Sequence, residues 1–188
     1  MRGRLVRLIV GENIMLIETM DGASLRAEID ALSQMLHLAV ADGANIGFVK
    51  PFTQDDAAQF WQTQILPLVE RSQSIMLAAR VEGAIVGTVQ LGLPVMPNQQ
   101  HKADVAKMMV HPGFRRRGIA AALLTALIDA AQERGFRILV LDTRTGDPAQ
   151  SLYARFGFER AGEIPGYAMN PDDPSTLDPT TYMYKWLT

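Results

Sequence analysis

Apolar residues recur at steps of three and four in the first third of the chain. The apolar positions of the first such stretch are Leu25, Ile29, Leu32, Leu36 and Val40. This spacing predicts a helix over residues 25–40, which Asp42 and Gly43 bring to an end. Thr53 is a suitable N-cap for a second helix, and Pro67 predicts that this helix bends or ends early.

The middle of the chain changes to short apolar runs and to a period of two. Residues 75–81 and 84–93 form two such runs, and the Glu-Gly pair between them favours a tight hairpin turn. Further strands are expected over residues 4–10 and 103–110. The two runs of the hairpin are therefore expected to be adjacent antiparallel strands.

Helices and strands alternate in the last part of the chain. Residues 118–134 carry apolar side chains at helical spacing, and Gly135 is placed to end this helix. Residues 136–141 are almost continuously apolar, which is typical of a strand covered on both faces. The remaining expected elements are a helix over residues 148–156 and strands over 158–164 and 181–187. This order predicts an α/β fold of the α+β type, with a mixed, mostly antiparallel central sheet and helices on both faces.

Composition favours a single globular domain over residues 1–188. The chain has 188 residues, of which 48 % are hydrophobic, so it can bury a core of its own. Its net charge of −2 gives no overall field that would attract nucleic acid or an anionic membrane. Cysteine is absent from the sequence, which excludes disulfides and cysteine nucleophiles.

A cytoplasmic protein is the expectation. The apolar stretch near the N-terminus is interrupted at Gly11 and has no small-residue cleavage site after it, so we expect no signal peptide. No window approaches the roughly 18 apolar residues that a membrane span requires. The three histidines are widely spaced and show no ligand pattern, so we expect no metal site.

The segment from Val110 to Ala121 joins an expected strand to an expected helix. It reads Val-His-Pro-Gly-Phe-Arg-Arg-Arg-Gly-Ile-Ala-Ala. Gly118 allows a tight turn at the start of the helix, where unpaired N–H groups and the helix dipole attract anions. The segment therefore predicts a pyrophosphate site. A solvated charge run and a nucleic-acid patch are the alternatives, but aromatic residues do not interleave with the arginines.

Two motifs resemble those of the GNAT superfamily of N-acetyltransferases. Arg115-x-x-Gly118-x-Ala120, after Met108-Met109-Val110, resembles the acetyl-CoA signature of that superfamily. The segment from Ala149 to Phe158 resembles its second motif, in which a helix places a tyrosine near the cofactor sulfur. A longer resemblance links the chain to the tabtoxin resistance acetyltransferases. The segments that carry it are Gly43–Phe48, Leu141-Asp142-Thr143, Ile164–Ala168 and Pro171-Asp172.

The resemblance implies an acetyl-CoA-dependent N-acetyltransferase with a GNAT-like fold that acts on the amine of a small molecule. Direct transfer is expected, because no cysteine can carry the acetyl group. The implied partners include neither nucleic acid nor membrane, and the protein would be a monomer or a homodimer. Acetylation of a protein or peptide is an alternative function, and so is an acetyl-CoA-binding regulatory module without catalysis.

The resemblance also implies roles for individual residues. The implied cofactor contacts are Met108, Met109, Val110, Arg115, Arg116, Arg117, Gly118, Ile119, Ala120 and Ala121. The N–H of Met109 or Val110 would polarise the thioester oxygen.

Tyr153 is the implied general acid, with a tyrosine that merely packs in the core as the alternative. Asp142 is a candidate base for the amine, with Asp104 or water as alternatives, and it could also be a strand-end aspartate that bonds turn amides. Gly146 stands where many members have asparagine, so Asp147 or Thr145 would have to replace that contact.

Overall fold

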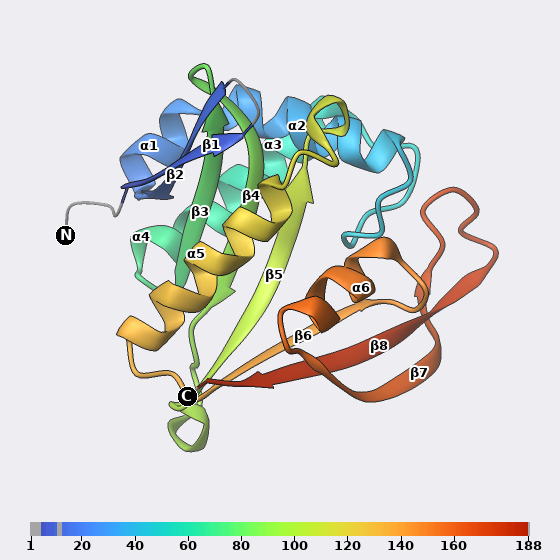
Figure 1. Ribbon diagram of the computed structural model, residues 1–188. Coiled ribbons are helices and arrows are strands. Elements are labelled where there is room, and N and C mark those ends of the chain that lie inside the picture. Colours follow the sequence, from blue (N-terminus) through green and yellow to red (C-terminus); the bar gives the residue numbers. More distant parts are fainter. Residues whose placement is uncertain (1–4, 11–12, 188) are drawn as a thin grey trace.

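The computed structural model describes residues 5–10 and 13–187, and its described strands form one mixed sheet of eight (Figure 1). The strands are β1 (Leu5–Val10), β2 (Asn13–Met20), β3 (Ser74–Val81), β4 (Ala84–Gly92), β5 (Lys102–Val110), β6 (Ile138–Arg144), β7 (Glu159–Met169) and β8 (Leu177–Trp186). Their order in the sheet is β1-β2-β3-β4-β5-β6-β8-β7. Neighbours are antiparallel except β5 and β6, which run parallel.

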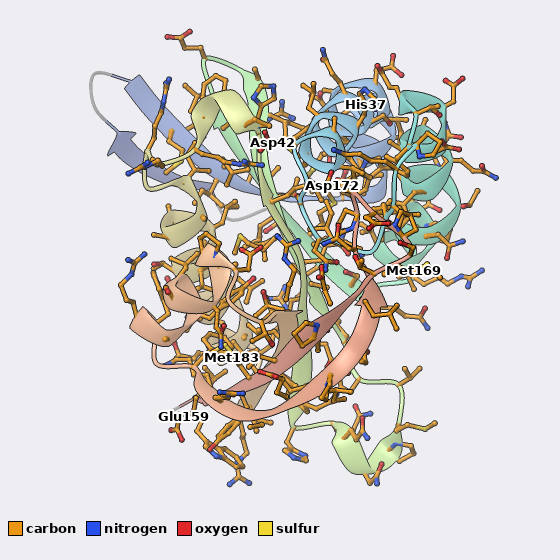
Figure 2. The ribbon with its side chains drawn as sticks, turned by 90° about the vertical axis from the view of Figure 1, so that its right-hand side faces the viewer. His37, Asp42, Glu159, Met169, Asp172 and Met183 are labelled. Atoms are coloured by element: carbon orange, nitrogen blue, oxygen red, sulfur yellow. The ribbon has the colours of Figure 1, made fainter. Side chains whose placement is uncertain are left out.

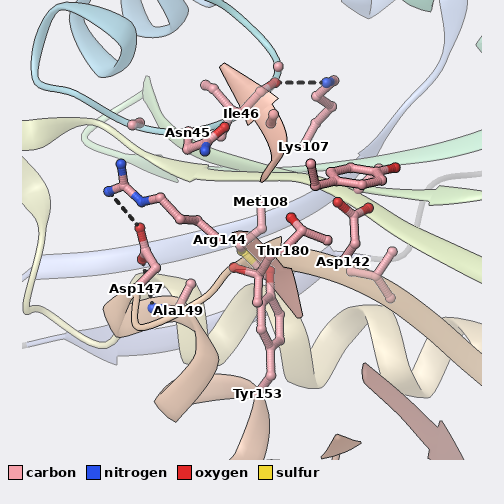
Figure 3. A pocket seen from close by; sticks show the side chains of 17 residues that line it. Asn45, Ile46, Lys107, Met108, Asp142, Arg144, Asp147, Ala149, Tyr153 and Thr180 are labelled. Atoms are coloured by element: carbon pink, nitrogen blue, oxygen red, sulfur yellow. Dashed lines mark hydrogen bonds and ion pairs between the residues drawn. The ribbon is translucent and has the colours of Figure 1, made fainter. Parts of the chain in front are cut away.

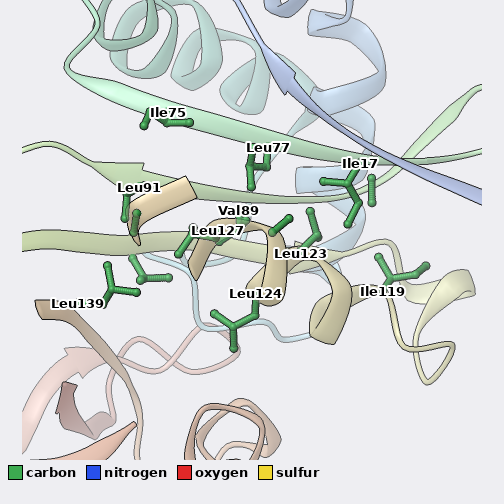
Figure 4. Packing of buried hydrophobic residues seen from close by; sticks show 14 of the residues in the cluster. Ile17, Ile75, Leu77, Val89, Leu91, Ile119, Leu123, Leu124, Leu127 and Leu139 are labelled. Carbon is green, nitrogen blue, oxygen red and sulfur yellow. The ribbon is translucent and has the colours of Figure 1, made fainter. Parts of the chain in front are cut away.

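Helices cover both faces of this sheet, as the sequence predicts. They are α1 (Gly22–Ala27), α2 (Ile29–Ala41), α3 (Gln54–Phe60), a π-helical turn (Trp61–Ile65), α4 (Leu66–Glu70), α5 (Ile119–Glu133) and α6 (Pro148–Arg155), with short 3₁₀ turns at Pro97–Gln99 and Pro112–Phe114. The alternation of side chains along a strand separates two apolar layers. In β3, Leu77 belongs to the layer under α5, while Met76 and Ala78 belong to the layer under α1 to α4 (Figure 4).

The predicted fold class is confirmed, and most predicted elements are found within a few residues. The strand expected over residues 4–10 is found as β1, except that residue 4 lies outside the described residues. The helix expected over residues 25–40 is divided at Glu28 into α1 and α2. In the second helix, the π-helical turn lies directly before Pro67, which has no N–H to continue an α-helical ladder.

One strand was missed in the sequence, and the expectation that residues 136–141 are covered on both faces is wrong. β2 was not expected from the sequence, although Met15 and Ile17 alternate inward and are at most 1 % exposed. β6 is covered on only one face: Leu139 and Leu141 are buried, while Ile138 and Val140 are partly exposed. The second face of β6 stays partly exposed because the hydrophobic core packed against α1 to α4 includes no residue of β6.

The last two strands form a longer hairpin than predicted, and its loop crosses to the N-terminal half of the molecule. In that loop the carbonyl of Pro171 accepts from the N–H of Lys50 at 3.0 Å. The Lys50 ammonium also lies 2.6 Å from the Asp172 carboxylate. Figure 2 shows Asp172 close to the C-terminal end of α2, where Asp42 is labelled. The loops over residues 42–52 and 170–176 thus contact each other.

Candidate functional site

β5 and β6 pair over only three residues and then diverge. Lys102 to Asp104 pair with Ile138 to Val140. Beyond this point β5 keeps only β4 as a neighbour, and β6 keeps only β8. In the described part of the chain, the β6-facing edge of β5 therefore has no strand partner from Val105 onward, and Figure 1 shows the resulting V-shaped opening. Such an edge offers N–H and C=O groups to an extended ligand.

A β-bulge interrupts β5 beside this opening. Ala106 pairs with Gln90 and Met109 pairs with Thr88, so Lys107 and Met108 together lie opposite one residue of β4. Lys107 has a φ of +50°, a left-handed value that is uncommon for lysine. After the bulge, the His111 N–H donates to Val86 on β4 at 2.9 Å. Because backbone groups alternate along a strand, the Val110 N–H faces the opening instead.

Two adjoining cavities lie at this opening. The first, which we call the acceptor cavity, has a volume of about 320 Å³ and includes Tyr153, Asp142 and Lys107 in its lining (Figure 3). The second, which we call the cofactor cavity, has a volume of about 310 Å³ and includes Met109, Val110 and Arg115. The residues that line both cavities are Ala44, Ile46, Met108, Arg144 and Asp147.

The loop before α5 presents free backbone N–H groups, as predicted for an anion site. Gly118 is the N-cap of α5 with a φ of +78°, and Arg116 also has a positive φ of +62°. Among the described residues, no carbonyl or side chain accepts from the N–H groups of residues 116–121. Successive N–H groups in such a turn, at the positive end of a helix dipole, fit a diphosphate.

The side chains of this loop differ from one another in their contacts. Arg115 forms an ion pair with Asp42 at the end of α2. The Arg117 guanidinium lies 5.0 Å from the centre of the Phe114 ring, while Arg116 is exposed. Ile119 is only 2 % exposed and belongs to the core under α5. Of the three arginines in this loop, Arg115 lines the cofactor cavity. Ala120 and Ala121 lie in the first turn of α5.

Tyr153 extends from α6 into the acceptor cavity, as Figure 3 shows. Its side chain is 6 % exposed, and its ring packs against Phe158 with the centroids 5.6 Å apart. Burial raises the pKa of its hydroxyl, and the negative charges of Asp147 and Asp142 raise it further. The phenol therefore keeps its proton at neutral pH and can donate it into the cavity.

The two candidate bases have different surroundings. Asp142 lies in β6 beyond the last β5–β6 pair and lines the acceptor cavity. Within the described residues its carboxylate has no hydrogen-bond or ion-pair partner, so the structure does not show it bonding turn amides. Asp104 lies where β5 and β6 still pair, and both of its carboxylate oxygens are 2.9 Å from the Lys102 ammonium. Asp104 lines neither cavity.

Lys107 was missed by the sequence analysis. Its ammonium donates to the Ile46 carbonyl at 2.9 Å and lies 5.4 Å from the centres of the Phe48 and Phe60 rings. Burial lowers the pKa of this lysine, and the charge of Asp142 partly opposes that shift. The sequence shows a lysine within an otherwise apolar strand. That pattern alone does not indicate that the lysine side chain reaches a cavity.

Arg144 and Asp147 form an ion pair beside the two cavities. The sequence indicated Asp147 as a possible cofactor contact, but it did not indicate Arg144. Arg144 is paired with Asp147 at 3.3 Å and with Asp178 at 3.5 Å. Asp147 also caps α6 by accepting from the Ala149 N–H at 3.0 Å. Of the two residues expected to replace the family asparagine, Asp147 lines both cavities and Thr145 lines neither. Thr145 instead bonds Thr181 through their hydroxyls at 2.8 Å.

A tyrosine pair lies at the far wall of the acceptor cavity. The Tyr167 hydroxyl, from β7, is 2.8 Å from that of Tyr182 on β8, and Tyr167 lines the cavity. This hydrogen bond raises the pKa of Tyr182 to about 12. The Tyr182 phenol therefore stays protonated near neutral pH.

Neither a metal-binding cluster nor a membrane-spanning helix is found among the described residues. In residues 5–10 and 13–187, no group of three or more His, Asp or Glu side chains is arranged to hold a metal ion. None of the described helices is long and apolar enough to cross a membrane.

Comparison with known proteins gives one consistent result. Residues 39–158 match the Acetyltransferase (GNAT) family. The chain is 34 % identical over 108 residues to an uncharacterized N-acetyltransferase encoded in the hisH-hisA intergenic region of Azospirillum brasilense. That match covers 56 % of this chain and 62 % of the relative, so the chain spans less than two thirds of the relative's length.

Solved structures show the same fold. An N-acetyltransferase from Staphylococcus aureus Mu50 superposes with a TM-score of 0.74 at 20 % identity, covering 93 % of this chain and 99 % of that one. A Salmonella typhimurium protein solved with its cofactor acetyl-CoA superposes with a TM-score of 0.72 at 19 % identity, covering 93 % and 94 %. At these identities the likeness is one of fold.

Proposed function

Because the chain belongs to the GNAT family of acetyltransferases, we propose that it transfers the acetyl group of acetyl-CoA to the amine of a small molecule. One observation carries the proposal. The open edge of β5 and the buried Tyr153 meet at the opening between β5 and β6, and the free N–H groups of residues 116–121 directly follow Arg115, which lines the cofactor cavity.

Binding of coenzyme A would use backbone groups more than side chains. The N–H groups of residues 116–121 bind the diphosphate, and Arg115 adds charge beside it. The open edge of β5 at Met108 to Val110 pairs with the pantetheine arm as an added strand would. When bound, acetyl-CoA supplies an activated acetyl group. The Val110 N–H, which faces the opening, is the better placed of the two predicted donors to the thioester oxygen.

Asp142 and Tyr153 would handle the protons. Asp142 holds the incoming ammonium and accepts its proton, directly or through water. Tyr153 donates a proton to the departing thiolate. Burial in this site would also raise the pKa of a thiol above its ordinary value of about 8.5, which favours proton transfer from the phenol to the thiolate.

The closure of the site supports a small acceptor. The contacts of Lys50 with Pro171 and Asp172 join two loops over the acceptor side of the molecule. The acceptor cavity of about 320 Å³ is within the range of small-molecule sites, roughly 300–1,000 Å³. The relation to the tabtoxin resistance enzymes, the single domain, the cytoplasmic location and the oligomeric state stay predictions.

Thiol release from acetyl-CoA over a panel of small amines tests this function. Tyr153→Phe should lower kcat roughly 100-fold or more, the usual effect of losing a general acid, while acetyl-CoA binds with unchanged affinity. Tyr184→Phe is the control, because that hydroxyl bonds Glu159 and lines neither cavity. Equal turnover in the Tyr153→Phe protein would remove the assigned acid.

The same measurements separate the alternative functions. Tight acetyl-CoA binding with no turnover of any amine or peptide would favour a regulatory module without catalysis. Faster turnover of peptide N-termini than of small amines would favour a protein acetyltransferase. Failure to bind coenzyme A would contradict the proposal at its first step.

A further inference from the structure

The charges that line the acceptor cavity are not all balanced within the protein. Four acidic or basic side chains line it, namely Lys107, Asp142, Arg144 and Asp147. Arg144 forms ion pairs with both Asp147 and Asp178, at 3.3 and 3.5 Å, so this group has one more negative than positive charge. Within the described residues, neither Lys107 nor Asp142 has an ion-pair partner. One cation and one anion therefore remain in the cavity for a ligand.

These two charges stand on opposite arms of the opening. Lys107 is on β5 and Asp142 is on β6, after the strands have separated. Asp142 is close enough for its charge to shift the pKa of Lys107, so both charges act on the same space. A ligand with one positive and one negative group can satisfy both at once.

The Lys107 ammonium has capacity for such a ligand. An ammonium has three donors, and the Ile46 carbonyl takes one of them at 2.9 Å. The rings of Phe48 and Phe60, both 5.4 Å from the nitrogen, stabilise the charge without accepting a conventional hydrogen bond. A partly buried charge without a counter-ion gains most from an anionic ligand.

We propose that Lys107 is a specificity residue that binds a carboxylate on the same small molecule whose amine is held by Asp142. The favoured acceptor is then a zwitterion of the amino-acid type. A polyamine or polycationic antibiotic would bring a second positive charge against Lys107, and a peptide N-terminus lacks a carboxylate beside its amine. This inference rests on the proposed function.

Matched acceptors test the inference directly. Each set contains an L-amino acid, its amide and the corresponding amine without the carboxyl group, for example L-leucine, L-leucinamide and isopentylamine. Sets built on all common side chains are compared by calorimetric binding to the complex with coenzyme A. A pH of about 6 keeps the amines protonated, so only the carboxylate differs. The best-bound amino acid should bind roughly tenfold or more tightly than its amide, the effect of one charge-assisted hydrogen bond.

Substitution of Lys107 distinguishes specificity from a purely structural role. Lys107→Met should reduce the preference for the acid over the amide to within about twofold, while Lys107→Arg should keep it. If Lys107 only tethers the loop at Ile46, Lys107→Met weakens the acid and the amide equally, and the inference is overturned. Wild-type protein that binds amides as well as acids, or binds neither, also overturns it.

Measurement of thiol release distinguishes a failure of this inference from a failure of the proposed function. Lys107-dependent binding of amino acids without thiol release would support the inference and contradict the catalytic function. Thiol release from amides or simple amines, with no preference for acids, would support the function and contradict the inference.

Discussion

The position of Tyr153 determines the pH range over which its hydroxyl can act as an acid. Burial, followed by the charges of Asp147 and Asp142, raises its pKa above the ordinary value of 10.0. A general acid works only while protonated, so its contribution is lost only as the pH rises through that raised pKa. We expect kcat to show no descending limb up to about pH 10. A decline centred below about pH 9 would identify a different acid.

Asp142 and Asp104 can be distinguished by one pair of substitutions. Asp142→Asn removes an unpaired carboxylate from the acceptor cavity, and we expect kcat/KM for the amine to fall roughly 100-fold. Asp104→Asn removes a half-exposed ion pair with Lys102. That pair is worth about 0–1 kcal/mol of stability, and its loss should leave kcat/KM nearly unchanged. Steady-state kinetics of both variants check this, and the reverse order would make Asp104 the base.

At the residue level, the sequence best predicted those functional features that depend on the local backbone conformation. The positive φ of Gly118 and the free N–H groups after it follow from neighbours in the chain, and both were expected. Lys107 was not expected, because its environment depends on a β-bulge and on a loop some sixty positions earlier. The balance of charges in the acceptor cavity likewise depends on strands that are distant in sequence.

The turn before α5 provides a test at the level of an element. Gly118 has a φ of +78°, and an added Cβ would meet no atom within 4 Å, so Gly118→Ala strains only the backbone. The cost of a left-handed alanine is about 1–2 kcal/mol. Because relief of this strain turns the N–H groups away from one another, we expect acetyl-CoA affinity to fall roughly tenfold.

A second glycine makes this test specific. Gly83, in the β3–β4 hairpin, has a φ of +84° and the same open surroundings, but it lines neither cavity. Gly83→Ala should lower the melting temperature about as much as Gly118→Ala and leave acetyl-CoA affinity unchanged. Calorimetry on both proteins checks this. Equal affinities would show that the turn does not hold the diphosphate.

Elements with regular periodicity were predicted well, and those with interrupted patterns were not. α5 and the β3–β4 hairpin show their periods plainly in the sequence. β7 was predicted too short because Pro165 lies within it, and proline is tolerated there because β7 is an edge strand whose pairing with β8 is interrupted between Ile164 and Ala168. The single covered face of β6 depends on where α1 to α4 end, which its own apolar run does not encode.

The whole molecule should be stabilised by coenzyme A, because three residue pairs alone join β5 to β6. A ligand at 100 times its dissociation constant adds about 2.7 kcal/mol to the free energy of unfolding. For a chain of this size, that raises the melting temperature by roughly 5–10 °C. Thermal unfolding with and without acetyl-CoA checks this, and Gly118→Ala protein should show a smaller rise at the same concentration.

The overall architecture could be predicted from the order of elements, but the closure of the site could not. Strand and helix order, together with the two motifs, was enough to predict the mixed sheet with helices on both faces. The contacts between Lys50 and Asp172 join positions more than a hundred residues apart. No local pattern marks such a pair, so whether the acceptor side is open or closed depends on the folded chain.

The narrow junction of β5 and β6 has a consequence for the life of the protein in a cell. β6, β8 and β7 join the rest of the sheet through three residue pairs with β5, so this junction is a place where local opening can expose the chain to proteases. Coenzyme A bound as proposed would contact both strands and protect this junction. We therefore expect the protein to be degraded faster when acetyl-CoA is scarce.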